Sequence, residues 1–133
     1  MKRIAALLLV LLLSLTTAHA NSPRDLMSRL ETMVLMSGFD MPIKAIREQI
    51  ASALDVVVQQ SRLRDGSRKI ISISEVVGME GDTITLQDIF VYRPTGFGPD
   101  GTAGSFISTG IRPGFVEKMA DNGVAVRDEW FHS

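Results

Sequence analysis

The sequence contains no cysteine and only two histidines among its 133 residues. Without cysteine the chain can form neither a disulfide nor a thiolate metal site, and cysteine usage gives no indication of the redox compartment. His19 and His132 lie near opposite ends of the sequence, so we expect no histidine metal site within one chain. The formal net charge is −1, which provides no global field to attract a nucleic acid. We therefore expect no metal site and no nucleic-acid partner.

A second absence concerns nucleotide chemistry. The phosphate-binding loop of a P-loop ATPase ends in Gly-Lys-Ser/Thr, and no lysine of this chain follows a glycine: the four are Lys2, Lys44, Lys69 and Lys118. The acidic strand end that would hold magnesium is also missing, because the only Asp-Glu pair, Asp128-Glu129, lies in a polar C-terminal tail. No motif that pairs a nucleophile with a base occurs either. We expect no nucleotide-binding residues, no cofactor and no ATP hydrolysis by this chain alone.

The first 20 residues have the form of a secretory signal. Lys2 and Arg3 precede an apolar run over residues 4–13, and Ala18-His19-Ala20 resembles a cleavage site. The apolar run is shorter than the roughly 20 residues that a membrane-spanning helix needs. Two interpretations stay open. The segment is either foreign to the domain that follows, from a rearranged gene or a misassigned start, or it is an export signal whose removal leaves Asn21 as the first residue.

Helical periodicity and residues typical of helix ends predict two helices after this segment. Ser22 and Pro23 suit an N-cap and a first helical position, and Gly38 suits a helix end. The second helix is expected from about Pro42 through Ala53. Its buried stripe should contain Ile43, Ile46, Ile50 and Leu54, with Arg47 among the residues that face solvent.

Residue patterns in the second half of the chain predict strands and a final short helix. Strands are expected at 56–58, 70–77 and 83–92, separated by turns at Asp65-Gly66 and at 78–82. In the middle strand, the apolar residues Ile71, Ile73 and Val77 are expected to be buried opposite Ser72, Ser74 and Glu75. The glycine and proline content of residues 94–105 predicts an irregular, mobile loop. A helix should begin near Pro113 and end at Asn122-Gly123.

Residues 61–92, SRLRDGSRKIISISEVVGMEGDTITLQDIFVY, resemble the C-terminal part of CpaF-type secretion ATPases. These are the hexameric motors of Tad/Flp pilus assembly, within the type II and type IV secretion ATPase superfamily. Other segments are similar to the same family in the same order: SLTTAHANSPRD at 14–25, which resembles its His-box, SRLETMVLMSG at 28–38, IREQIASALD at 46–55, and TGIRP at 109–113. The resemblance covers roughly residues 14–124.

The resemblance implies an α/β fold, namely the C-terminal half of a RecA-like P-loop ATPase domain, with two helices, an antiparallel strand meander and a short C-terminal helix. Residues 1–20 are then a signal-like or foreign segment, and residues 21–133 a partial secretion-ATPase domain. The function implied is that of a truncated fragment of a pilus-assembly or secretion motor, whose family uses ATP and Mg²⁺. Its partners would be further copies in a hexamer or inner-membrane secretion subunits, at the cytoplasmic face of the inner membrane. Two alternatives stay open: a small exported binding or structural protein, secreted or periplasmic, and a non-functional gene remnant.

His19 is the candidate catalytic residue by resemblance alone. In the His-box of the family, an imidazole can hydrogen-bond the terminal phosphate of the nucleotide. The alternative is that His19 is a leftover of the parent domain or part of a cleaved signal.

Arginines form the second group of candidates. Arg62, Arg64 and Arg68, with Lys69, surround the Asp65-Gly66 turn and could bind phosphate, an acidic lipid or an acidic subunit face. The alternative is a solvated hairpin whose charges discourage sheet-to-sheet aggregation. Arg112 of TGIRP is expected to serve in packing at the start of the last helix or in a subunit contact.

Overall fold

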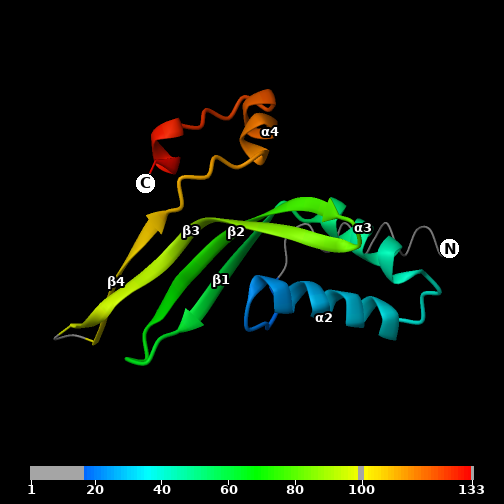
Figure 1. Cartoon of the computed structure of the whole chain (residues 1–133), viewed down its shortest axis with the longest axis horizontal. Helices are drawn as coiled ribbons and strands as arrows, with labels where there is room; N and C mark the ends of the chain where they lie inside the picture. The colour runs from blue at the N-terminus through cyan, green and yellow to red at the C-terminus, as the bar shows by residue number, and fades with distance from the viewer. Residues whose placement is uncertain (1–16, 99–100, 133) are drawn as a thin grey trace. The chain divides into compact units, whose positions relative to one another are not determined.

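The computed structural model describes residues 17–98 and 101–132 (Figure 1). The elements follow in the order α2 (Pro23–Met36), α3 (Ile43–Ala53), β1 (Val56–Arg62), β2 (Arg68–Glu80), β3 (Thr83–Gly98), β4 (Gly101–Ser108), α4 (Phe115–Asp121) and the 3-10 helix η1 (Asp128–Phe131). The strands form one sheet in the order β1-β2-β3-β4, a meander in which each strand pairs with its sequence neighbour. The expected α/β fold of two helices, a strand meander and a short C-terminal helix is confirmed.

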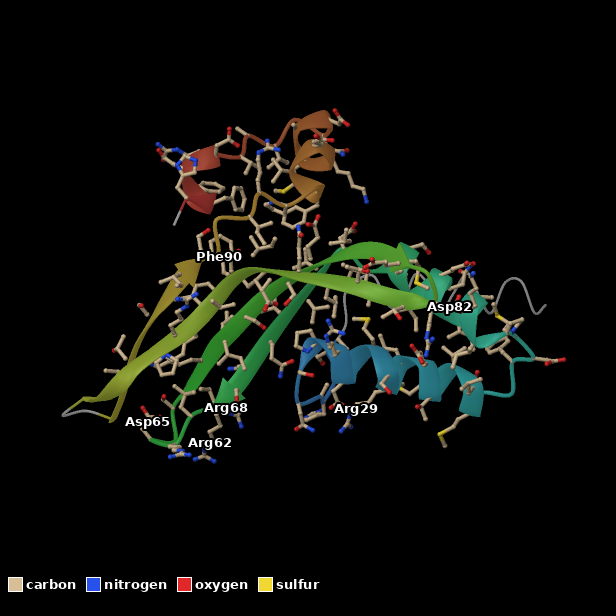
Figure 2. All side chains as sticks on the ribbon, viewed as in Figure 1. Arg29, Arg62, Asp65, Arg68, Asp82 and Phe90 are labelled. Atoms are coloured by element: carbon tan, nitrogen blue, oxygen red, sulfur yellow. The ribbon has the colours of Figure 1, made fainter. Side chains whose placement is uncertain are left out.

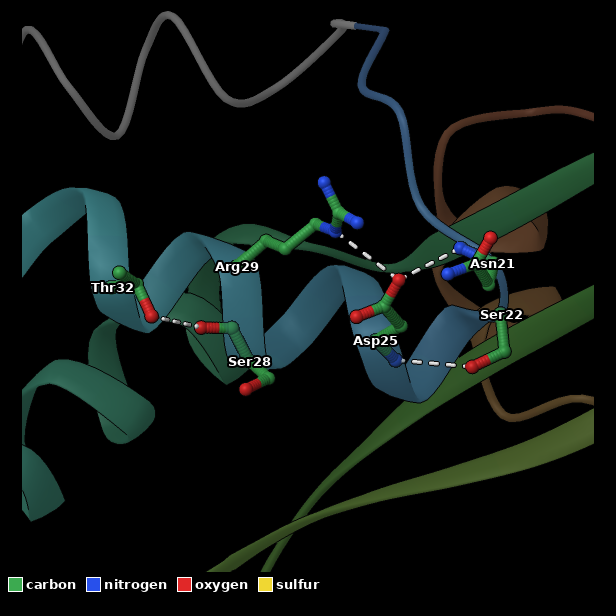
Figure 3. Close-up of polar contacts among 6 residues, drawn as sticks. All are labelled: Asn21, Ser22, Asp25, Ser28, Arg29 and Thr32. Carbon is green, nitrogen blue, oxygen red and sulfur yellow. Dashed lines mark hydrogen bonds and ion pairs between the residues drawn. The ribbon is translucent and has the colours of Figure 1, made fainter.

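Helix α2 begins at the residues that the sequence indicates. The Ser22 hydroxyl accepts a hydrogen bond from the Asp25 N–H at 3.1 Å, and one Asp25 carboxylate oxygen accepts from the Asn21 N–H at 2.8 Å and from Arg29 Nε at 3.1 Å (Figure 3). These contacts satisfy amide groups at a helix start, where no intrahelical acceptor exists. They also lower the pKa of the Asp25 carboxyl, chiefly through the hydrogen bond from the Asn21 backbone.

The chain divides into two compact units, of which the first combines the described part of Met1–Asp55 with Val76–Leu86. Arg47 of α3 was expected to face solvent; its side chain is 28% exposed, and its guanidinium makes contacts that the sequence did not predict. Its Nε and Nη2 atoms donate to the Glu31 carboxylate at 2.8 and 3.2 Å, and its Nη1 donates to the Asp82 carbonyl at 2.8 Å. A guanidinium offers several donors in a planar fork, so one side chain joins α2, α3 and the β2–β3 turn. The core residues of this unit are Met27, Leu30, Ile46, Ile50, Val76 and Ile84.

The second unit combines Val56–Glu75 with the described part of Gln87–Ser133. Its apolar cluster is built around the buried side chains of Ile89, Val116 and Phe131, with Phe90 packed against them. The Phe90 ring lies 5.7 Å from the Phe106 ring and 5.9 Å from the Phe131 ring, measured between centroids. Phe131 belongs to η1, which the sequence did not predict. The C-terminal segment therefore contributes core residues to this unit.

The prediction of an irregular loop over residues 94–105 is wrong. Strand β3 continues to Gly98, and β4 pairs with it from Phe90 opposite Ser108 to Gly98 opposite Gly101. Pro94 lies opposite Gly104, and the register shifts between Pro94 and Gly96, where Gly96 has a φ of +136°. A bulge of this kind accommodates a proline, which has no N–H to donate to the ladder.

Candidate functional site

His19 lies in the irregular segment 17–20 that precedes α2, and its side chain is exposed. It belongs to the first unit, whereas the candidate arginines belong to the second. Residues 14–16 of the segment that resembles the His-box lie outside the described residues. Within the described ranges, no group of three or more histidine or acidic side chains is arranged to hold a metal ion.

The predicted turn at Asp65-Gly66 is confirmed, and it brings Arg62 and Arg68 together at the end of the β1–β2 ladder (Figure 2). We call residues 62–69 the basic hairpin. The Asp65 carboxylate accepts hydrogen bonds from the Ser67 N–H at 2.9 Å and from the Ser67 hydroxyl at 2.7 Å. Gly66 has a φ of +84°, a conformation that favours glycine, and its carbonyl accepts from Arg62 Nε at 3.1 Å. The turn is thus held by its own side chains.

The charges of the basic hairpin are engaged unequally. The Lys69 ammonium lies over the Tyr92 ring, 5.2 Å from its centroid, a distance typical of a cation–π contact. Arg62, Arg64 and Arg68 are exposed, and none of them takes part in the ion pairs found in residues 17–98 and 101–132. The tip of this hairpin therefore carries three accessible guanidinium groups.

Arg112 does not belong to this cluster of arginines. Its Nε donates to the Asp128 carboxylate at 2.8 Å, and both side chains are exposed. This hydrogen bond is the main reason that the pKa of the Asp128 carboxyl lies below its usual value. Arg112 thus connects the segment before α4 with η1.

A polar junction that the sequence did not predict is buried at Ser74 and Glu75 of β2. Ser74 is 0% exposed and Glu75 is 6% exposed, whereas Val77, which was expected to be buried, is 55% exposed. One Glu75 carboxylate oxygen accepts from the Phe115 N–H at 3.0 Å, and the other accepts from the Gln87 amide at 2.9 Å. The expected alternation is wrong because these contacts satisfy the carboxylate, which allows it to be buried.

A second set of contacts extends the junction to the TGIRP segment. The Ser74 hydroxyl donates to the Asp88 carboxylate at 2.6 Å. The Thr109 hydroxyl donates to the Asp88 carbonyl at 2.7 Å, and the Thr109 N–H donates to the Ile89 carbonyl at 2.9 Å. Polar groups from β2, β3 and the segment after β4 are therefore joined, although no sequence period marks them. The only signal in the sequence was the Ser-Glu pair between Ile73 and Val76 of β2.

The structure thus defines an α/β chain with a four-stranded meander sheet, an exposed basic hairpin and a buried polar junction. In the part of the chain that is described, no helix has both the length and the apolar character needed to cross a membrane. No protein-family model matches the sequence, and no curated protein matches it.

Proposed function

We propose that this chain corresponds to the C-terminal part of a CpaF-type secretion ATPase and acts by contact with such a motor, not by ATP chemistry of its own. The observation that carries the proposal is that segments resembling the family contact each other within each unit. Arg47 of IREQIASALD donates to the Asp82 carbonyl at 2.8 Å. In the second unit, Thr109 of TGIRP donates to the Asp88 carbonyl. Segments inherited together from one domain are expected to retain such contacts.

The lysines support a role without nucleotide hydrolysis. In P-loop ATPases a lysine reaches the β- and γ-phosphates from a glycine-rich loop. Here Lys44 pairs with Asp82, and Lys69 lies over Tyr92. Under this proposal, binding to a hexameric motor or to inner-membrane secretion subunits, at the cytoplasmic face of the membrane, replaces catalysis as the activity. His19 would have no catalytic role in the chain alone.

The test adds the purified chain to a CpaF-type motor and measures co-migration on a sizing column together with the rate of phosphate release. We expect the chain to co-migrate with the motor and to lower its ATP turnover, while the chain alone releases no phosphate. An Arg47→Glu variant serves as control, because it places a carboxylate against Glu31 and should disrupt the first unit. Turnover by the chain alone, or failure to co-migrate, would overturn the proposal.

A second candidate function, a small exported protein, is favoured by the geometry at the start of α2. Cleavage after Ala20 would leave the helix complete, because α2 begins at Pro23 and its N-cap is Ser22. The Asn21 nitrogen already donates to the Asp25 carboxylate, and as a free ammonium it would gain a charge-assisted bond there. N-terminal sequencing of protein from the periplasm or medium decides between the candidates, since a start at Asn21 in good yield supports export.

A further inference from the structure

The end of the β1–β2 ladder places two like charges directly opposite each other. Arg62 and Arg68 are register partners in this antiparallel pair. Directly opposed residues lie on the same face of a sheet, with Cα atoms about 4.5–5.5 Å apart. Like charges at such positions destabilise the strand pair, and Arg64 adds a third positive charge near the turn. An anion bound between the arginines would relieve this repulsion.

Arg62 is already oriented for such a ligand. Its Nε donates to the Gly66 carbonyl at 3.1 Å, and a Cβ placed on Gly66 would lie 3.7 Å from its Nη2 atom. The guanidinium therefore lies along the turn. Because a guanidinium carries five N–H donors, this single bond leaves the four donors on the two Nη atoms for a ligand.

We propose that Arg62 and Arg68, assisted by Arg64, bind a phosphate group at the tip of the basic hairpin. A phosphate monoester offers three terminal oxygens and a charge of about −1.5 to −2, so it can accept hydrogen bonds from two opposed guanidinium groups at once. A carboxylate has two oxygens and one charge, and it matches a single arginine fork. The number and placement of the donors therefore favour phosphate. The inference is independent of the proposed kinship with secretion motors.

Binding is tested by titrating the full chain with pyrophosphate in an isothermal calorimeter. We expect saturable binding that the double variant Arg62→Gln/Arg68→Gln weakens at least tenfold. Arg93→Gln is the matched control, since Arg93 is an exposed arginine of β3 in the same unit, and it should change the affinity less than twofold. Arg62→Lys keeps the charge but loses the planar fork, so it should weaken binding several-fold. Equal affinity of the double variant and the unmodified chain would overturn the proposal.

Thermal unfolding gives a readout that a purely structural role would not produce. In phosphate-free buffer, Arg68→Gln should raise the melting temperature by about 1–3 °C, because it removes the opposed like charge. Excess pyrophosphate should raise the melting temperature of the unmodified chain and not that of the double variant, because only the former binds the ligand. A lower melting temperature for Arg68→Gln in phosphate-free buffer would contradict the repulsion on which the site depends.

The source of the phosphate is distinguished by sedimentation with phosphatidylcholine vesicles prepared with and without phosphatidic acid. Binding that requires phosphatidic acid and is lost in the double variant assigns the site to a lipid headgroup. Pyrophosphate binding without vesicle binding assigns it to a soluble phosphate compound, and both results support a phosphate site. Citrate, which offers only carboxylates and a hydroxyl, should compete weakly. Citrate binding as tight as that of pyrophosphate would refute the selectivity for phosphate.

Discussion

Replacement of Glu75 by leucine should loosen the C-terminal segment of the second unit. Leucine has a similar volume but offers no acceptor to the partly buried Phe115 N–H, which now donates to the carboxylate at 3.0 Å. An orphaned buried donor costs about 1–3 kcal/mol. The Gln87 amide, the other donor to Glu75, is carried by a flexible, partly buried side chain that can turn to water, so its loss adds little. We expect the free energy of unfolding to fall by about 2 kcal/mol.

Two measurements check this value. Urea unfolding can be followed by the fluorescence of Trp130, the only tryptophan, which lies in η1. The urea m-value of a small protein is about 1–3 kcal/mol per molar, so the midpoint should fall by about 1 M. Hydrogen exchange of the Phe115 amide should also accelerate by about 30-fold, the factor that corresponds to about 2 kcal/mol.

Two further variants serve as controls for this prediction. Glu75→Gln keeps one carbonyl oxygen that can accept from the Phe115 N–H, so its loss should be smaller, about 1 kcal/mol. Glu80→Gln removes an exposed charge from the same strand and should stay within about 0.5 kcal/mol of the unmodified chain. The reasoning fails if Glu75→Leu unfolds at the same midpoint as Glu80→Gln and the Phe115 amide exchanges at its original rate.

Three further predictions follow from single contacts. Gly104→Ala should lower the unfolding free energy by about 1–3 kcal/mol in urea, because the new Cβ would overlap the Tyr92 ring; an unchanged midpoint would contradict this contact. Asp25→Asn should lower the free energy of unfolding above about pH 5, because the folded state lowers the pKa of the Asp25 carboxyl and so favours its ionised form. The difference between variant and unmodified chain should vanish as the pH falls below 3.8, where the carboxyl becomes protonated; a difference that persists at low pH would contradict this prediction. Ile46→Ala should cost about 2–5 kcal/mol, whereas Ile43→Ala, at a side chain that is 45% exposed, should cost far less, and equal losses would show that the burial is misassigned.

Both N-terminal helices could be predicted because their boundary signals are local. Ser22 and Pro23 start α2, and the positive φ of Gly38 follows its end. The β3–β4 hairpin could not be predicted in the same way. Its glycines and Pro94 indicate a loop when they are taken in sequence, but the ladder depends on which residue each one faces, such as Gly104 opposite Pro94. The register depends on how two strands pair, and the composition of one segment does not indicate it.

In the candidate site too, contacts between residues close in sequence could be predicted, and contacts between distant residues could not. The proximity of Arg62 and Arg68 could be predicted, since a turn at Asp65-Gly66 sets the pairing of the residues that flank it. The contact of Glu75 with Phe115 joins residues 40 positions apart, and no pattern in the strand indicates it. Alternation predicted the opposite, with Val77 buried, because it takes no account of hydrogen bonds that distant residues make to a buried carboxylate.

Charged residues in this chain can be sorted by the sign of their effect on stability. Glu75 is buried and its oxygens have donors, so its replacement should lower the free energy of unfolding. Arg68 is exposed and opposed by Arg62, so its replacement should raise that free energy in the absence of a ligand. A placement that costs stability is expected where a residue serves binding, since selection for stability alone would remove it. Glu75→Leu should therefore lower the free energy of unfolding and Arg68→Gln should raise it. This difference distinguishes the buried polar junction, which stabilises the fold, from the proposed binding site.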